Sequence, residues 1–217
     1  MMDMNICWKY IISVPLVWWL TTGVISAQRN YNLGIDLTKT IVNHFPTGGS
    51  GVVIEPLYLY SKNDSKIKFK IPFGYSQVKM ENVFFNSKIK TTGAYIKPGI
   101  GYSSSKNVVP YLNLLFTIYT INNTYKLDGP VFGDYIDEYR HSNLFAFGIE
   151  PNIDYRFTLI KNLALITNIK LSMIFYNSES KDFPVHYIAG AGIVRSSKVI
   201  RSATRRFISG VNIYLVF

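Results

Sequence analysis

Charged side chains recur at alternate positions of segments that are otherwise apolar, where they could pair with one another or carry protons or ions. They comprise four acids and five bases: Asp36, Glu55, Glu150, Asp154, Lys68, Lys70, Lys97, Arg156 and Lys170. Two interpretations are open, an ion or proton path and a structural network of ion pairs. The choice depends on the space that the surrounding elements enclose, because a charge removed from water must find a partner.

A second basic group lies close to the C-terminal end of the chain. It consists of Arg195, Lys198, Arg201, Arg205 and Arg206. Guanidinium groups bind phosphate in a bidentate manner, so we expect contacts with lipid phosphates if this segment lies at a membrane surface. The alternative is a solubilising connection without a specific ligand.

The three histidines, His44, His141 and His186, fall in three different predicted connections, and none stands at a metal-ligand spacing from another. His141 and Ser142 place a base beside a hydroxyl. Neighbouring residues of a strand point to opposite faces, however, so a hydrogen bond between these two side chains is not expected. The sequence therefore predicts no catalytic residue, no metal and no cofactor.

The elements that carry these residues are predicted to be eight antiparallel strands. Apolar and polar residues alternate with the period of two that is typical of strands, and no amphipathic helix stands out. The expected strands cover residues 31–42, 51–61, 66–77, 93–103, 109–121, 143–157, 163–176 and 206–217. Connections after the second, fourth and sixth strands are short and the others long, notably 122–142 and 177–205, a layout typical of transmembrane barrels.

Residue size predicts which face of these strands lies inside a closed barrel. The polar faces collect the glycines, and small residues suit the crowded concave side, so Phe, Ile and Leu fall outside. An eight-stranded interior is just wide enough for its own side chains, which favours an ion-pair network that fills it. A soluble lipocalin-like barrel, with the apolar face inside, is the alternative.

Two features do not fit a regular barrel. Pro56, Pro72, Pro98 and Pro151 fall within predicted strands, and we expect bulges at some of them because proline donates no ladder hydrogen bond. Residues 184–195 are too apolar for an ordinary connection. They could extend a strand, fold back as a plug, or show that the strand count is wrong.

Residues 1–27 have the features of a cleaved signal peptide, with Lys9 before an apolar run that ends at Ala27. Removing them from the 217 residues leaves one domain, 28–217, of 190 residues without cysteine and still with a charge of +10. Such a charge favours anionic partners, here lipid phosphates instead of nucleic acid.

The last strand ends on alternating apolar residues, Val211, Ile213, Leu215 and Phe217. A soluble protein has little reason to end on an aromatic residue. This ending resembles the insertion signal of Gram-negative outer-membrane barrels, which is read by the barrel-insertion machinery. With the motifs YNLGIDL, GAYIKPGIGYS and FGIEPNIDYRF, the chain resembles small OmpA/OmpX-type barrels, and more narrowly PorT-like barrel proteins of unknown function.

The resemblance implies a monomeric, integral outer-membrane protein in contact with lipopolysaccharide. We therefore expect a non-enzymatic barrel with a filled lumen that presents surface loops for binding, adhesion or envelope maintenance. A lipid A-modifying enzyme and a soluble periplasmic carrier are the alternatives.

Overall fold

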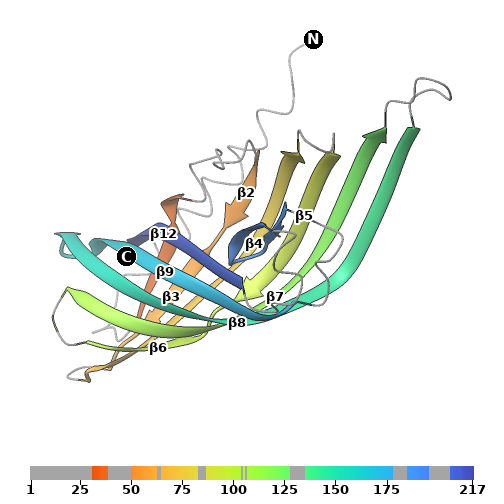
Figure 1. The fold of residues 1–217 in the computed structure, drawn as a ribbon. Coiled ribbons are helices and arrows are strands. Elements are labelled where there is room, and N and C mark those ends of the chain that lie inside the picture. The colour runs from red at the N-terminus through yellow and green to blue at the C-terminus, as the bar shows by residue number, and fades with distance from the viewer. Residues whose placement is uncertain are drawn as a thin grey trace, which may run out of the picture.

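A computed structural model describes residues 31–38, 50–62, 65–82, 87–103, 105, 107–127, 135–177, 185–195 and 206–217. These residues form an all-β protein (Figure 1). The strands are β1 (Tyr31–Asp36), β2 (Ser50–Ile54), β3 (Pro56–Tyr60), β4 (Ile67–Asn82), β5 (Ser87–Ile96), β6 (Gly99–Tyr102), β7 (Val108–Leu127), β8 (Tyr135–Ile160), β9 (Leu163–Asn177), β10 (Val185–Ile188), β11 (Gly192–Arg195) and β12 (Arg206–Val216). The proposed signal peptide lies outside the described residues.

The main sheet closes on itself as a hydrogen-bonded ring of eight antiparallel strands. Two of the eight strands are interrupted, one into β2 and β3 and the other into β5 and β6. When β2 with β3 and β5 with β6 are each counted as one strand, every strand pairs with its neighbour in the chain, β9 pairs with β12 across the β10–β11 hairpin, and β12 pairs with β1 to close the ring. The eight predicted strands, their order and their antiparallel pairing are therefore confirmed.

The terminal strand closes the ring. Gly34 of β1 lies opposite Val216 of β12. Phe217 extends this pairing beyond the strand, because its N–H donates to the Leu33 carbonyl at 2.9 Å and the Leu33 N–H donates to the Phe217 carbonyl at 3.3 Å. The apolar C-terminal residues thus have a structural role at the junction between the first and last strands.

The four prolines do not shift the pairing of the strands. Pro56 and Pro98 lie at the two interruptions, yet Ile54 opposite Tyr75 and Leu57 opposite Pro72 keep one register across the first of them. The bulges expected at prolines are therefore wrong. The register shifts lie in β7–β8 between Tyr119 and Ile121, and in β8–β9.

Several strands are longer than predicted where they approach the long connections. Residues 78–82 and 87–92, expected in a connection, continue β4 and β5, and only 83–86 separate them. Much of the predicted 122–142 connection is also strand, because β7 runs to Leu127 and β8 begins at Tyr135. Asn143 lies beside the β7–β8 register shift and has a φ of 58°, a conformation that asparagine tolerates. The pairing of β7 with β8 continues beyond this irregularity, whereas the sequence pattern there predicted the end of a strand.

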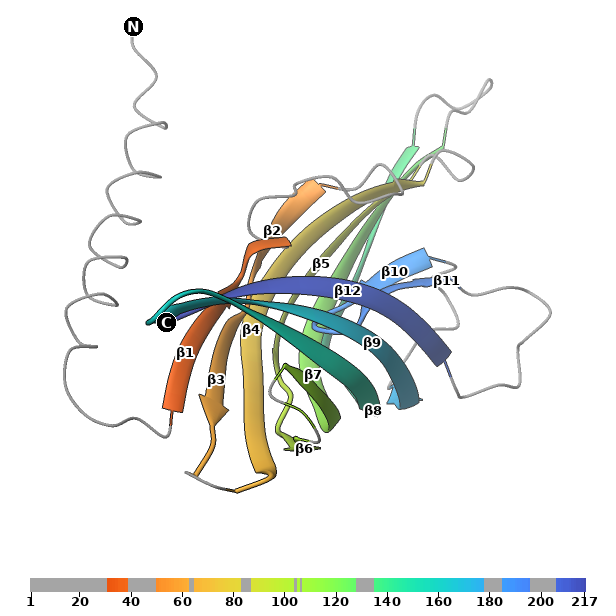
Figure 2. The same cartoon turned by 90° about the vertical axis from the view of Figure 1, so that its left-hand side faces the viewer.

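The segment predicted to be a strand extension, a plug or a counting error forms the β10–β11 hairpin inside the ring. Tyr187, Ile188, Ala189 and Ala191 are all buried. Figure 2 shows the hairpin beside β12, on the concave side of the sheet. Of the three alternatives left open by the sequence, the folded-back plug is confirmed.

The two faces of the ring differ as the alternation predicts. Phe69 and Phe147 are 44% and 36% exposed on the outer face, whereas Glu55, Lys70 and Lys97 are almost completely buried. The large apolar side chains therefore point outward and the charged ones inward, which is the reverse of a lipocalin-like arrangement.

Candidate functional site

The interior of the ring changes from apolar to polar along its strands. The inward residues of β8, taken from the long connections toward the short turn at 161–162, are Leu144, Ala146, Gly148, Glu150, Asn152, Asp154 and Arg156. Along β8 the interior is therefore apolar near the long connections and charged near the short turns. A second buried apolar cluster, Leu57, Leu59, Ile166, Tyr214 and Val216, accompanies the charged groups in the short-turn half.

Four buried side chains form one network, which we call the four-charge network. The Lys97 Nζ lies 3.4 Å from both Glu55 Oε2 and Glu150 Oε1, and the Lys170 Nζ lies 3.4 Å from Glu150 Oε2. Glu55 and Lys97 stand at the two strand interruptions, whereas Glu150 and Lys170 belong to β8 and β9. Two acids and two bases compensate one another across the ring, as a water-poor interior requires.

Hydroxyl groups complete the coordination of both glutamates. Tyr95 donates to Glu55 Oε2 at 2.6 Å, Tyr214 donates to Glu55 Oε1, and Ser172 donates to Glu150 Oε2 at 2.5 Å. Sequence reasoning did not assign these three residues to the network. The sequence did contain a signal for them, because they occupy the same inward-facing positions of their strands as the charges.

A second buried cluster lies closer to the short turns. The Lys70 ammonium donates to Asp154 Oδ1 and Oδ2 at 2.7 and 2.9 Å, and to Asn152 Oδ1 at 3.1 Å. Asn168 donates to Asp154 Oδ1 at 2.6 Å, and the Lys70 Nζ lies 5.0 Å from the centre of the Tyr111 ring. Asp154 is thus held by Lys70 and lies outside the four-charge network, although the sequence placed it in one interior network with those charges.

The remaining predicted network residues are Asp36, Lys68 and Arg156. Asp36 is buried, and its Oδ1 accepts a hydrogen bond from the Thr38 hydroxyl at 2.5 Å. Lys68 and Arg156 are half-buried and line a cavity. All three lie on inward positions of their strands, and the ion pairs described above join four of the nine charged residues in one network.

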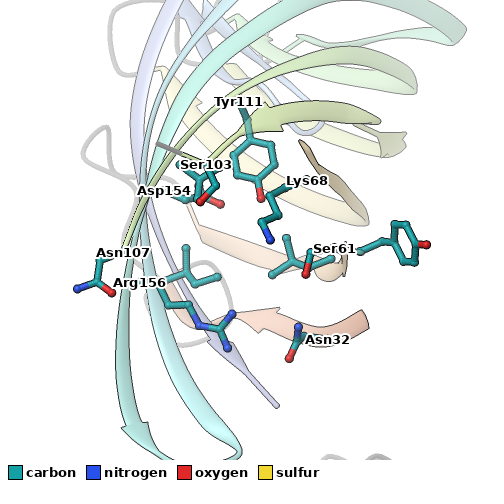
Figure 3. Close-up of a pocket in the computed structure, with 12 residues that line it drawn as sticks. Asn32, Ser61, Lys68, Ser103, Asn107, Tyr111, Asp154 and Arg156 are labelled. Atoms are coloured by element: carbon teal, nitrogen blue, oxygen red, sulfur yellow. The ribbon is translucent and has the colours of Figure 1, made fainter. Parts of the chain in front are cut away.

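This cavity, of about 330 Å³, lies at the short-turn end of the ring (Figure 3). Its walls come from the ends of β1, β3, β4, β7, β8 and β9 and from two short turns. The polar residues among them are Asn32, Tyr60, Ser61, Lys68, Ser103, Asn107, Tyr111, Asp154 and Arg156.

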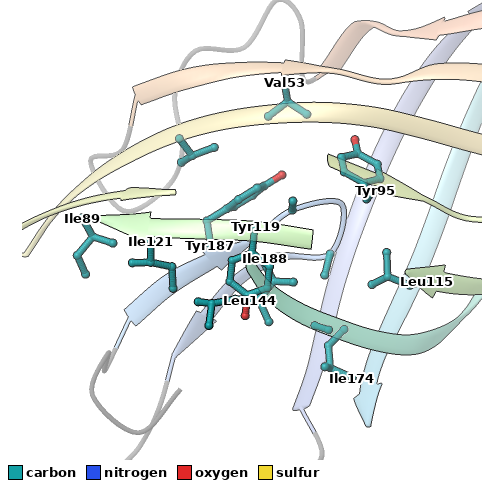
Figure 4. Close-up of a cluster of buried hydrophobic side chains, with 14 of the residues drawn as sticks. Val53, Ile89, Tyr95, Leu115, Tyr119, Ile121, Leu144, Ile174, Tyr187 and Ile188 are labelled. Carbon is teal, nitrogen blue, oxygen red and sulfur yellow. The ribbon is translucent and has the colours of Figure 1, made fainter. Parts of the chain in front are cut away.

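The apolar half of the interior is filled by the β10–β11 hairpin. Tyr187 and Ile188 pack in one buried cluster with Tyr95, Tyr119 and other residues of β2, β4, β5, β7, β8 and β9 (Figure 4). A Cβ added at Gly190, where φ is +79°, would lie 2.6 Å from the Tyr95 ring. Glycine is therefore required at this close approach. The Lys170 ammonium donates to the Gly190 carbonyl at 3.1 Å, which connects the hairpin to the four-charge network.

The outer face carries an apolar belt, in which residues paired across four neighbouring strands form rows. Phe73, Ile96, Phe116 and Phe147 form one such row, and each lies opposite the next. Further toward the long connections, a row on the same face is wholly polar: Lys79, Lys90, Asn122 and Arg140. The apolar surface is thus a continuous band with a defined boundary.

Aromatic residues gather at the short-turn end of the belt. The Tyr31 ring stacks at 6.4 Å from both Tyr58 and Tyr60, and Tyr60 lies 6.2 Å from Phe69. This grouping on the outer face contrasts with the tyrosines that bind Glu55 inside the ring. Aromatic residues of this kind accompany the polar–apolar boundary of membrane-spanning sheets.

Most of the predicted phosphate-contacting residues cannot be placed. Lys198, Arg201 and Arg205 lie outside the described residues. Arg195 ends β11 opposite Val185, and Arg206 begins β12 opposite Ile174. The contact with lipid phosphates stays a prediction.

The histidine positions differ from the prediction. His141 lies in β8 opposite Ile121, and His186 lies in β10 opposite Val194, so neither is in a connection. His44 lies outside the described residues. Ser142 is exposed next to the half-buried His141, as alternation within the extended β8 implies.

Neither models of protein families nor curated proteins match this chain. Within the part of the chain that the structure describes, helices of the length and apolarity needed to cross a membrane are absent.

Proposed function

We propose that the protein is an integral outer-membrane β-barrel of eight transmembrane strands, exported by its N-terminal signal peptide and inserted by the barrel-insertion machinery. Its lumen is filled, it has no enzymatic role, and it presents its long connections at the cell surface for binding, adhesion or envelope maintenance. The observation that carries this proposal is the apolar belt on the outer face, combined with a charged interior.

The extent of the belt supports a membrane environment. On β8 its outward apolar residues run from Phe145 to Leu159. Fourteen steps of about 3.3 Å give about 46 Å along the strand, and a tilt of about 40° reduces this to about 35 Å, enough to cover the apolar band of about 25 Å in transmembrane barrels together with its flanking aromatic girdles. A soluble protein rarely exposes a continuous apolar surface of this size, because such a surface aggregates in water.

The filled interior argues against a soluble carrier. A carrier needs an apolar cavity for its ligand, but here the apolar half is occupied by the β10–β11 hairpin and the other half by ion pairs. The proposal therefore assigns the outer face to lipid, and packing fills the interior except for the cavity at the short-turn end.

The surface role is based on the extension of β7 and β8 beyond the polar edge of the belt. Residues 121–127 pair with 135–141 in a hairpin that projects from the ring (Figure 1). Ile136 is 60% exposed and Tyr139 50% exposed on this extension. In the proposed orientation this hairpin stands above the outer leaflet, where it presents exposed apolar and aromatic side chains to a partner.

A pair of matched substitutions tests the membrane assignment. Leu114→Lys places a charge in the middle of the belt, and Ile136→Lys places the same charge on the projecting hairpin. We expect Leu114→Lys to lower the free energy of unfolding in lipid vesicles by about 2–4 kcal/mol, and Ile136→Lys by less than about 1 kcal/mol, because the cost of a lysine depends on depth.

Urea titration of the protein folded into phosphatidylcholine vesicles measures both values. Membrane fractionation of the wild-type protein provides an independent measurement. A chain that stays monomeric in buffer without detergent, or two substitutions with equal cost, would contradict the proposal.

A further inference from the structure

The cavity at the short-turn end has an excess of positive charge that the interior clusters do not neutralise. Lys68 of β4 and Arg156 of β8 both line it. Within the described ranges, neither residue forms an ion pair with a carboxylate. Figure 3 shows the two side chains pointing into the space enclosed by the strand ends.

The acid in the cavity wall, Asp154, is already engaged. Both of its oxygens accept hydrogen bonds from the Lys70 ammonium, and Oδ1 also accepts one from Asn168. Asp154 and Lys70 compensate one another, so two positive charges remain on the cavity wall. Half-buried cations interact more strongly than solvated ones because the local dielectric constant is lower, so an anion between them would be stabilised.

The geometry of the wall suits a small anion. The volume of about 330 Å³ is at the lower end of the range for small-molecule sites. Arg156 offers a bidentate donor pair, Lys68 a point charge, and Asn32 and Ser61 add neutral polar groups at the same end. All four lie on inward positions or at the rim, away from the apolar belt, so the anion would come from water.

We propose that this cavity is a binding site for a small water-borne oxyanion, with a phosphate or carboxylate group held between Arg156 and Lys68. This inference goes beyond the proposed function, because it uses the interior of the ring and not the membrane assignment.

Calorimetric titration with inorganic phosphate tests the proposal. The full chain is held in a zwitterionic detergent at constant ionic strength, so that general screening does not vary. We expect saturable binding that Arg156→Gln and Lys68→Gln each weaken by about tenfold or more, which corresponds to the loss of one charge-assisted hydrogen bond. Lys62→Gln is the matched control, because Lys62 is exposed at the same end of the ring and its substitution removes the same charge.

Two further variants keep the test decisive if a charge substitution prevents folding. Arg156→Lys retains the charge and removes the bidentate geometry, so we expect intermediate binding. Val109→Phe fills the cavity without changing any charge and should abolish binding.

Three results overturn the proposal: no saturable binding at millimolar phosphate, an equal loss in Lys62→Gln, or saturable binding of an anionic phospholipid added to the detergent while inorganic phosphate does not bind. The last result assigns the two cations to a lipid headgroup. Because the titration is independent of membrane insertion, it can fail while the outer-membrane proposal stands, and the reverse is also possible.

Discussion

The two halves of the ring interior are filled by different means. Near the long connections, the β10–β11 hairpin supplies Tyr187 and Ile188 to an apolar cluster, and Gly190 allows it to approach Tyr95. Toward the short turns, the strands themselves supply charges in the four-charge network and the Lys70–Asp154 cluster. The apolar half depends on shape and burial, whereas the charged half depends on the ion pairs of its two clusters. Lys170 contacts both halves.

The largest expected effect comes from removing one acid of the four-charge network. Glu150→Ala leaves Lys97 without one of its two acids and Lys170 without its ion-pair contact to Glu150. We expect the free energy of unfolding to fall by about 3–5 kcal/mol, since an uncompensated buried charge is strongly destabilising. Urea titration measures the loss.

Glu81→Ala is the matched control for this substitution. Glu81 pairs with Lys88 at 3.6 Å on the surface, where both side chains are more than half exposed. Surface pairs contribute about 0–1 kcal/mol, so little change is expected. Equal losses in the two variants would show that the interior network is no more important than a solvated pair.

The hairpin is tested by adding one carbon at its turn. Gly190→Ala places a Cβ against the Tyr95 ring in a backbone conformation that alanine adopts only with strain, so we expect a loss of about 1–3 kcal/mol. Faster proteolysis of the segment around 185–195 should accompany it. In Gly210→Ala, the new Cβ would meet the flexible Lys170 side chain at 3.1 Å and no positive φ is involved. A loss as large in Gly210→Ala would mean that the hairpin turn is not a special position.

The smallest effect concerns the link between the halves. In a double-mutant cycle of Lys170→Met with Tyr187→Ala, we expect a coupling energy of about 0.5–1.5 kcal/mol, because Lys170 holds the hairpin backbone that positions Tyr187. Lys70→Met is the matched variant for comparison, since Lys70 contacts β7, β8 and β12 and, among the described residues, not the hairpin. The Lys70 cycle should be additive. Coupling of the same size in both cycles would indicate a general loosening of the ring.

Alternation made the strands and their faces predictable, but it could not identify partners within the interior. The positions of Glu55, Lys97, Glu150 and Lys170 were expected on inward faces, and they are buried there. Asp154 also faces inward, yet its partner is Lys70, because register and curvature set the distances between strands far apart in the chain. No pattern along one strand contains that information.

The sequence alone determined the eight antiparallel strands. It also determined that large apolar side chains lie on one face and glycines and charges on the other. Both follow locally, from the two-residue period of a strand and from side-chain size. Only the tertiary structure decided that residues 185–195 fold into the ring, that the prolines keep the register, and that, among the described residues, Lys68 and Arg156 line the cavity at the short-turn end without an ion pair. These outcomes depend on which strands meet across the interior, and closure of the ring brings together residues that are far apart in the chain.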